Sequence, residues 1–180
     1  MKVLLVYASI HGSTREVAEY MARAFEWEGF EVDLASVDML PEVRSEYDAV
    51  VLGSAIHNGR VLPEMVNYIN RFRAALVKKP LYLWVTCIRV LESNGREHVL
   101  NNYIPQSELG DLPVLDVGVF AGKLDLESVN WNEAWTLAVR YDGVTPPRSH
   151  DGDYRDWKAV EAWTKATARA IDSIVGEARG

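Results

Sequence analysis

Short apolar runs alternate along this chain with segments of helical periodicity. Runs such as residues 3–7 are continuous, which is typical of strands covered on both faces of a sheet, whereas residues 31–36 alternate. The segments between them place apolar residues three or four positions apart, as on one face of a helix. This alternation favours a parallel sheet with helices on both sides. The expected strands are residues 3–7, 31–36, 49–52, 81–85 and 114–120.

Three segments are expected to form the helices that cover the sheet. The first follows strand one and ends at Gly29, the second has Pro63 in its first turn and stops before Pro80, and the last covers about 157–175. Since crossovers between parallel strands are right-handed, five strands suit a doubly wound sheet with the order 2-1-3-4-5. Residues 1–180 are expected to form one domain.

One connection is too long for this simple alternation. Residues 123–156 separate the fifth strand from the last helix, an unusual length for a connection. Within this insert, Trp131 and Trp135 lie one helical turn apart. We interpret them as part of a substrate or partner surface; the alternative is that they only fix the insert to the domain. The insert has four basic and seven acidic residues, so we do not expect it to bind anionic membranes.

The overall charge and the single cysteine exclude several classes of protein. A net charge of -7 disfavours nucleic acid as a partner. Cys87 is the only cysteine, so no intrachain disulfide can form, and with no secretory signal pattern we expect a cytoplasmic protein. The four histidines lack the spacing of metal ligands, so no metal site is expected.

The segment between the first strand and the first helix has the composition of an anion site. It combines three hydroxyl groups, a glycine and the free N–H groups of a helix N-terminus. It lacks the spacing of a nucleotide-triphosphate loop and two of the three glycines of the dinucleotide motif, so a single terminal phosphate is the best match. The alternative is that Ser13 or Thr14 caps the helix and no ligand binds. The residues of this segment are Ser9, Ile10, His11, Gly12, Ser13 and Thr14.

The pattern Ser-x-x-Gly-Ser-Thr directly after a first strand resembles the phosphate loop of flavodoxins. Three further segments are similar to the menaquinone-dependent protoporphyrinogen dehydrogenase family, a flavodoxin-like group: Gly-Ser-Ala-Ile-His-Asn-Gly at 53–59, Phe-Ala-Gly-Lys-Leu at 120–124 and Tyr-Arg-Asp-Trp at 154–157. The long insert containing Trp131 is shared as well. Each motif is modest alone, but their order and spacing extend the resemblance over nearly the whole chain. It implies a flavodoxin-like α/β fold.

The resemblance also implies FMN as the cofactor, held by its phosphate at residues 9–14. It places the isoalloxazine ring between two loops that follow the third and fourth strands, with backbone amides of both loops at the ring edge. The redox partner would then be a small molecule of the quinone or porphyrin type, or a redox protein. The implied ring-binding residues are Ser54, Ala55, Ile56, His57, Asn58, Gly59, Thr86, Cys87, Ile88 and Arg89.

The chain departs from the family pattern at three places. His11 stands where the family often has an acidic residue, and His57 and Asn58 stand where it has an arginine and an aromatic residue. The insert is acidic here, whereas the family's insert is basic. These departures weaken the implication of membrane association and of a porphyrin substrate.

The two ring-binding loops contain no aromatic residue between 54 and 59 or between 86 and 95. Flavodoxins that carry electrons commonly cover the ring with aromatic side chains from these loops. An uncovered ring leaves room for a substrate, which favours an FMN-dependent oxidoreductase over a flavodoxin-type carrier. The alternative is that Tyr103, Trp131 or Trp135 covers the ring. A flavin-free protein that binds another phosphorylated ligand is a third possibility.

Three side chains near the expected ring are candidates for chemistry. His57 is the candidate catalytic residue, as a proton donor or as a positive charge that stabilises reduced flavin. Cys87 ends a neighbouring strand and could form a nucleophilic pair with His57, although a lone cysteine there is more often a small core residue. Arg89 could face the flavin or a carboxylated substrate; the alternative is a solvated loop residue.

Overall fold

A parallel sheet of five strands organises the computed structural model, which describes residues 1–124 and 152–179. The strand order is β2-β1-β3-β5-β6, so the expected 2-1-3-4-5 order of a doubly wound fold is confirmed. A short strand, β4 (Arg60–Val61), pairs with the end of β3 in the antiparallel direction. The parallel strands are β1 (Lys2–Ala8), β2 (Glu31–Ser36), β3 (Ala49–His57), β5 (Leu81–Thr86) and β6 (Val114–Phe120).

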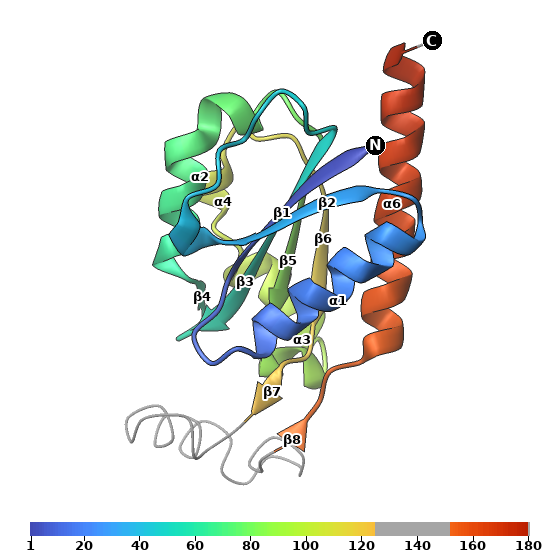
Figure 1. Ribbon diagram of the computed structural model, residues 1–180. Helices are drawn as coiled ribbons and strands as arrows, with labels where there is room; N and C mark the ends of the chain where they lie inside the picture. Colours follow the sequence, from blue (N-terminus) through green and yellow to red (C-terminus); the bar gives the residue numbers. More distant parts are fainter. Residues whose placement is uncertain (125–151, 180) are drawn as a thin grey trace, which may run out of the picture.

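Helices cover both faces of this sheet (Figure 1). Helices α1 (Ser13–Trp27) and α6 (Trp157–Arg179) lie together on one face, and α2 (Pro63–Leu76) covers the other. The inner strands β1, β3 and β5 are therefore buried on both sides, which explains their apolar runs. Leu5 and Val51 pack beneath α1 and α6, whereas Leu4, Val50 and Leu52 pack beneath α2.

The third strand is longer than the sequence analysis expected. We predicted a strand over 49–52 and a loop from Gly53, but β3 continues to His57 and turns back into β4 as a hairpin. The two-residue turn consists of Asn58 and Gly59, whose φ angles of 50° and 72° are both positive, as a type I′ turn requires. An Asn-Gly pair is a strong local hairpin signal, so the local sequence itself accounts for this turn.

Between β5 and β6 the chain forms helices that the periodicity did not predict. These are the 3-10 helix η2 (Ile88–Leu91), α3 (Gly95–Asn102) and α4 (Gln106–Leu109); a further 3-10 turn, η1 (Val37–Met39), follows β2. Within α3 the sequence has few apolar residues, and only Val99 and Gly95 are buried. A helix with so little apolar surface leaves almost no periodic pattern to detect.

The insert leaves and rejoins the domain through a short antiparallel ladder. β7 (Lys123–Leu124) pairs with β8 (Gly152–Asp153), and the Tyr154 N–H donates to the Gly122 carbonyl. The predictions for Trp131 and Trp135 fall on residues 125–151, outside the described residues. Among the residues that are described, no helix is long and apolar enough to cross a membrane.

Candidate functional site

Three segments converge at the carboxyl ends of the parallel strands, the lower end in Figure 1. They are the connection from β1 to α1, the β3–β4 hairpin and the segment after β5. Strand register brings them together, because Ala8 lies opposite Ser54 and Ala55 lies opposite Thr86. Ligands of open α/β sheets bind at this edge, so the structure places the predicted site segments where such a site belongs.

The N-terminus of α1 offers backbone donors that the helix itself does not use. The first intrahelical bond runs from the Glu16 N–H to the Gly12 carbonyl at 3.1 Å. The N–H groups of Ser13, Thr14 and Arg15 therefore have no acceptor within the helix. The N-cap residue is Gly12, without a side-chain cap, so the alternative that Ser13 or Thr14 caps the helix is wrong.

Gly12 allows this loop to form an open cradle. Its φ of 86° lies in the left-handed region that glycine adopts without strain. A Cβ atom placed there would meet nothing within 4 Å, so the space beside the loop is open. Ser9 supports the turn, because its hydroxyl accepts from the Gly12 N–H at 3.1 Å, while Ile10 and His11 are exposed beside it. Free backbone donors next to open space, together with neutral hydroxyl groups, fit a phosphate monoester.

The side chain of Thr14 is turned toward β5. Its hydroxyl oxygen lies 2.8 Å from that of Thr86, and both residues are buried. The start of α1 and the end of β5 are thus joined by a direct hydrogen bond. Nothing in the local pattern around either threonine indicated this pair.

The hydroxyl of Ser54 makes two hydrogen bonds to the backbone of the hairpin and of the residue that precedes α2. It donates to the Ala55 carbonyl at 2.7 Å and accepts from the Leu62 N–H at 3.1 Å, at the start of α2. Ser54 is buried, Ala55 and Ile56 are half-buried, and the Asn58 side chain at the turn is exposed. Ser54 therefore organises the hairpin and the entry to α2.

An aromatic residue borders the hairpin although neither loop contains one. A Cβ atom at Gly59 would lie 3.2 Å from the Tyr103 ring, so this ring packs directly against the turn. Tyr103 follows α3 and also contacts His98 edge to face, with ring centroids 5.1 Å apart. Of the three aromatic residues considered as covers for the ring, Tyr103 lies beside an expected flavin segment.

The segment after β5 is held by contacts of its own. The Cys87 N–H donates to the Phe120 carbonyl at 2.9 Å, so this amide already has a backbone acceptor. The side chain of Cys87 is buried. Arg89, at the start of η2, pairs with Glu92 at 2.6 Å and is half-buried, so it is not a freely solvated loop residue.

His57 ends β3 as expected, whereas Cys87 lies one residue beyond the end of β5, at the N-cap of η2. The register that pairs Ala55 with Thr86 makes β3 and β5 adjacent up to this edge, where His57 is half-buried. Within residues 1–124 and 152–179, no group of three or more His, Cys, Asp or Glu side chains is arranged to hold a metal ion.

Arg155 is a site residue that the sequence analysis did not single out, although it lies within the Tyr-Arg-Asp-Trp motif. Only 5% of its side chain is exposed. Nε and Nη2 bind the Asp153 carboxylate, and Nη1 donates to Glu16 and to the Ser13 carbonyl, at the start of α1. These acidic partners raise the pKa of the guanidinium, chiefly through Asp153. The guanidinium also lies over the Trp157 ring, 4.6 Å from its centroid.

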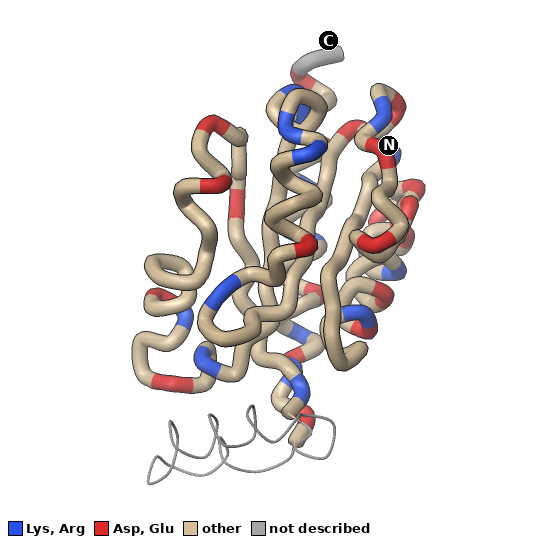
Figure 2. Tube along the Cα trace, turned by 90° about the vertical axis from the view of Figure 1, so that its left-hand side faces the viewer, with Lys and Arg blue, Asp and Glu red and all other residues tan. Residues whose placement is uncertain are grey.

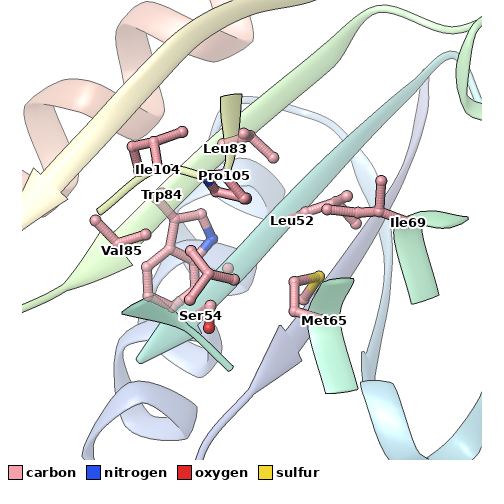
Figure 3. Close-up of a pocket in the computed structure, with 11 residues that line it drawn as sticks. Leu52, Ser54, Met65, Ile69, Leu83, Trp84, Val85, Ile104 and Pro105 are labelled. Atoms are coloured by element: carbon pink, nitrogen blue, oxygen red, sulfur yellow. The ribbon is translucent and has the colours of Figure 1, made fainter. Parts of the chain in front are cut away.

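A small apolar cavity lies between β3, β5 and α2 (Figure 3). Its volume is about 10 Å³, roughly the space of one water molecule. Its lining includes Leu52, Met65, Ile69 and Ile104. A flavin ring cannot enter it, so the open edge formed by the three segments remains the candidate site.

Charges of both signs are distributed over the described surface (Figure 2). Several cations near the site are already paired with acidic side chains, including Arg15 with Glu19 and Arg89 with Glu92. The site is therefore not a concentrated basic patch, which agrees with the net charge of -7.

This architecture, with an open loop before α1 at the carboxyl edge of a doubly wound sheet, is that of the flavodoxin-like proteins. The model of the flavodoxin domain family matches residues 4–141. The chain therefore belongs to the flavodoxin domain family.

Comparison with individual proteins agrees with this assignment. The chain is 24% identical over 176 residues to protoporphyrinogen IX dehydrogenase [quinone] of Escherichia coli K12, covering 96% of this chain and 97% of that protein. A flavodoxin from the domain Archaea superposes with a TM-score of 0.53 at 14% identity, covering 96% of this chain and 99% of the other. Rubredoxin oxygen:oxidoreductase of Desulfovibrio gigas gives a TM-score of 0.54 at 18% identity, covering 96% of this chain but 36% of that longer chain. These structural likenesses support the fold.

Proposed function

We propose that this protein binds FMN at the edge formed by β1–α1, the β3–β4 hairpin and the segment after β5, and that it acts as an FMN-dependent oxidoreductase. The observation that carries the proposal is the cradle at the start of α1. There, Gly12 opens the loop and the N–H groups of Ser13, Thr14 and Arg15 have no acceptor in their helix. Such a set of neutral donors suits one terminal phosphate.

The chain's own residues would bind and orient the cofactor. Residues 9–14 bind the phosphate, with Ser9 holding the turn and Thr14 adding a hydroxyl from the first helical turn. The hairpin turn at Asn58 and Gly59, and η2 after β5, would border the ring. When bound, FMN supplies the redox chemistry, and the protein supplies position, electrostatics and access.

His57 is the residue that we propose for proton transfer at this site. It ends β3, at the edge where the three segments meet, and is half-buried. An imidazole at this place can donate a proton or carry the positive charge that favours a reduced, anionic ring.

The substrate class that we propose is a quinone or a porphyrinogen. The support is the E. coli relative, whose name gives both and which matches this chain over nearly its full length. A cytoplasmic location is consistent with Cys87 being the chain's single cysteine.

A flavodoxin-type electron carrier is the second candidate, and Tyr103 is the observation that favours it. This ring packs against Gly59 and therefore borders the place where aromatic side chains cover the flavin in carriers. A protein partner would then replace the small-molecule substrate.

Two experiments test these proposals in order. The visible spectrum of the purified protein, followed by titration of the apoprotein with FMN and with riboflavin, should show much tighter binding of FMN because riboflavin lacks the phosphate. Equal affinities would contradict the phosphate cradle. Anaerobic mixing of the FMN-loaded protein with protoporphyrinogen, quinones and reduced nicotinamides should then give direct turnover. Reduction that requires a partner reductase would instead establish the carrier.

A further inference from the structure

A buried hydrogen bond joins two of the three segments at the candidate site. The hydroxyl oxygens of Thr14 and Thr86 lie 2.8 Å apart, although 72 positions separate them in sequence. Thr14 is 1% exposed and Thr86 is 5% exposed. Thr14 is the second residue of α1, whereas Thr86 is the last residue of β5 and is held against β6 opposite Phe120.

The number of protons in this pair restricts what Thr14 can do. Each hydroxyl group carries one proton, and a phosphate oxygen without a proton only accepts. If Thr14 gave its proton to Thr86, it would have none for a phosphate. For Thr14 to donate to the phosphate, it must accept from Thr86, so the two hydroxyls form a chain that ends at the ligand.

The position of Thr86 makes it a well-ordered partner for this role. Thr86 lies in a strand that pairs with neighbours on both sides, so its backbone is fixed. As a β-branched residue it also has few side-chain conformations. A donor held in this way orients the acceptor oxygen of Thr14 and polarises its O–H bond, which strengthens the next hydrogen bond in the chain.

We propose that Thr86 is a positioning residue that orients the Thr14 hydroxyl toward the FMN phosphate, and that it thereby sets part of the preference for FMN over riboflavin. The inference rests on the proposed function. Thr86 acts here through Thr14, with no contact of its own to the phosphate. Its removal should therefore weaken binding of the phosphorylated ligand alone.

The test measures the dissociation constants of FMN and riboflavin for the full-length apoprotein and its variants by flavin fluorescence quenching. Thr86→Val keeps the shape of the side chain and removes the hydroxyl. It should weaken FMN binding about fivefold, the size of one hydrogen bond between neutral groups, and leave riboflavin binding nearly unchanged. Thr86→Ser, which keeps the hydroxyl, should retain the wild-type preference.

A matched control comes from a second buried threonine outside the site. The Thr164 hydroxyl in α6 donates to the Val160 carbonyl at 2.8 Å, and the residue is fully buried. Thr164→Val removes a buried hydroxyl of the same kind, so it can lower stability but should not change the ratio of the two flavin affinities.

The variant Thr14→Ala serves as a background that shows whether Thr86 acts through Thr14 or contacts the phosphate directly. In that background, Thr86→Val should have no further effect on the FMN-to-riboflavin ratio. If Thr86→Val lowers the FMN-to-riboflavin affinity ratio in the Thr14→Ala background as much as in the wild type, the inference is overturned. It is also overturned if Thr86→Val alone weakens binding of both flavins equally or leaves the ratio unchanged. If Thr86→Val does not fold, Thr86→Cys, whose thiol is a weak donor, is compared with Thr86→Ser on the same criteria.

The outcomes also separate this inference from the proposed function. A wild-type protein that binds FMN no better than riboflavin would contradict the phosphate cradle, and with it this inference. A wild-type preference for FMN that survives Thr86→Val would overturn the inference alone.

Discussion

Nη1 of Arg155 lies 2.7 Å from a carboxylate oxygen of Glu16, although 139 positions separate the two residues. The same guanidinium binds Asp153 at 2.6 Å and donates to the Ser13 carbonyl at 3.3 Å. It therefore connects the strand that ends the insert to the first turn of α1, next to the phosphate cradle. All three of its nitrogen atoms are used in these contacts.

Arg155→Gln should destabilise the protein. The substitution removes the contacts to Asp153 and Glu16 and leaves their carboxylates without this buried partner. The expected loss is about 1 to 3 kcal/mol in the free energy of unfolding, measured by urea denaturation, because the two carboxylates are partly solvated. Arg15→Gln is the control, because Arg15 is an exposed arginine of the same region whose ion pair, with Glu19 four residues away, is solvent-exposed. The loss of unfolding free energy in Arg15→Gln should stay below about 0.5 kcal/mol. Similar losses in both variants would contradict the structural importance of Arg155.

The contribution of Asp153 should depend on pH. Hydrogen bonds from Arg155 hold the pKa of this carboxyl below its ordinary value of 3.8. A lowered pKa in the folded state means that the unfolded state binds more protons as the pH falls, so the stabilisation is complete above the ordinary pKa and is lost as the pH drops through the folded value. The difference in unfolding free energy between the wild type and Asp153→Asn should thus be constant from about pH 5 to 7 and shrink below about pH 4. In the Arg155→Gln background this pH dependence should largely disappear.

Gly53→Ala should disturb the packing beneath α1. Gly53 lies opposite Trp84 across β3 and β5, and a Cβ atom at Gly53 would lie 2.0 Å from Cε2 of the indole. Because Trp84 is fully buried, the ring has little room to move, and overpacking should cost about 1 to 3 kcal/mol in unfolding free energy. Combining the variant with Trp84→Phe should recover part of this loss.

Gly176 provides the control for that substitution. It lies in α6, and a Cβ atom there would meet nothing within 4 Å. Gly176→Ala should stabilise the protein by up to about 1 kcal/mol, since alanine favours helix more than glycine does. A loss of stability at Gly176, or none at Gly53, would contradict the packing described for these positions.

Thr14→Ala should weaken FMN binding by about 1.5 to 3 kcal/mol, the value of a hydrogen bond to a charged group. Isothermal titration of the apoprotein measures this loss directly, and riboflavin serves as the ligand control because it lacks the phosphate. A loss below about 0.5 kcal/mol would show that the Thr14 hydroxyl does not reach the phosphate and serves only its contact with Thr86.

The order of the sheet and the place of the proposed phosphate cradle could be predicted from local patterns. Continuous apolar runs such as residues 81–85 mark strands covered on both faces, and their alternation with helical segments leaves few topologies. The cradle follows because a glycine and hydroxyl residues stand directly between a strand and a helix. The Asn58–Gly59 hairpin is also predictable from local sequence, since an Asn-Gly pair favours a type I′ turn.

The partners of the site residues were decided only by the tertiary structure. Thr14 meets Thr86, Cys87 donates to Phe120, and Arg155 reaches Glu16, each through the register of strands and the placement of helices that are distant in sequence. Helix α3 also depends on this context, since it buries only Gly95 and Val99 and has almost no periodic pattern.

By itself, the sequence determined the α/β class, the strand order and the open glycine-containing loop before the first helix, because periodicity and turn residues act over a few neighbouring positions. Only the tertiary structure decided which hydroxyls, amides and charges at the site are already engaged. A hydrogen bond depends on a donor and an acceptor coming within about 3 Å, and for residues far apart in the chain that distance is set by the packing of the whole domain.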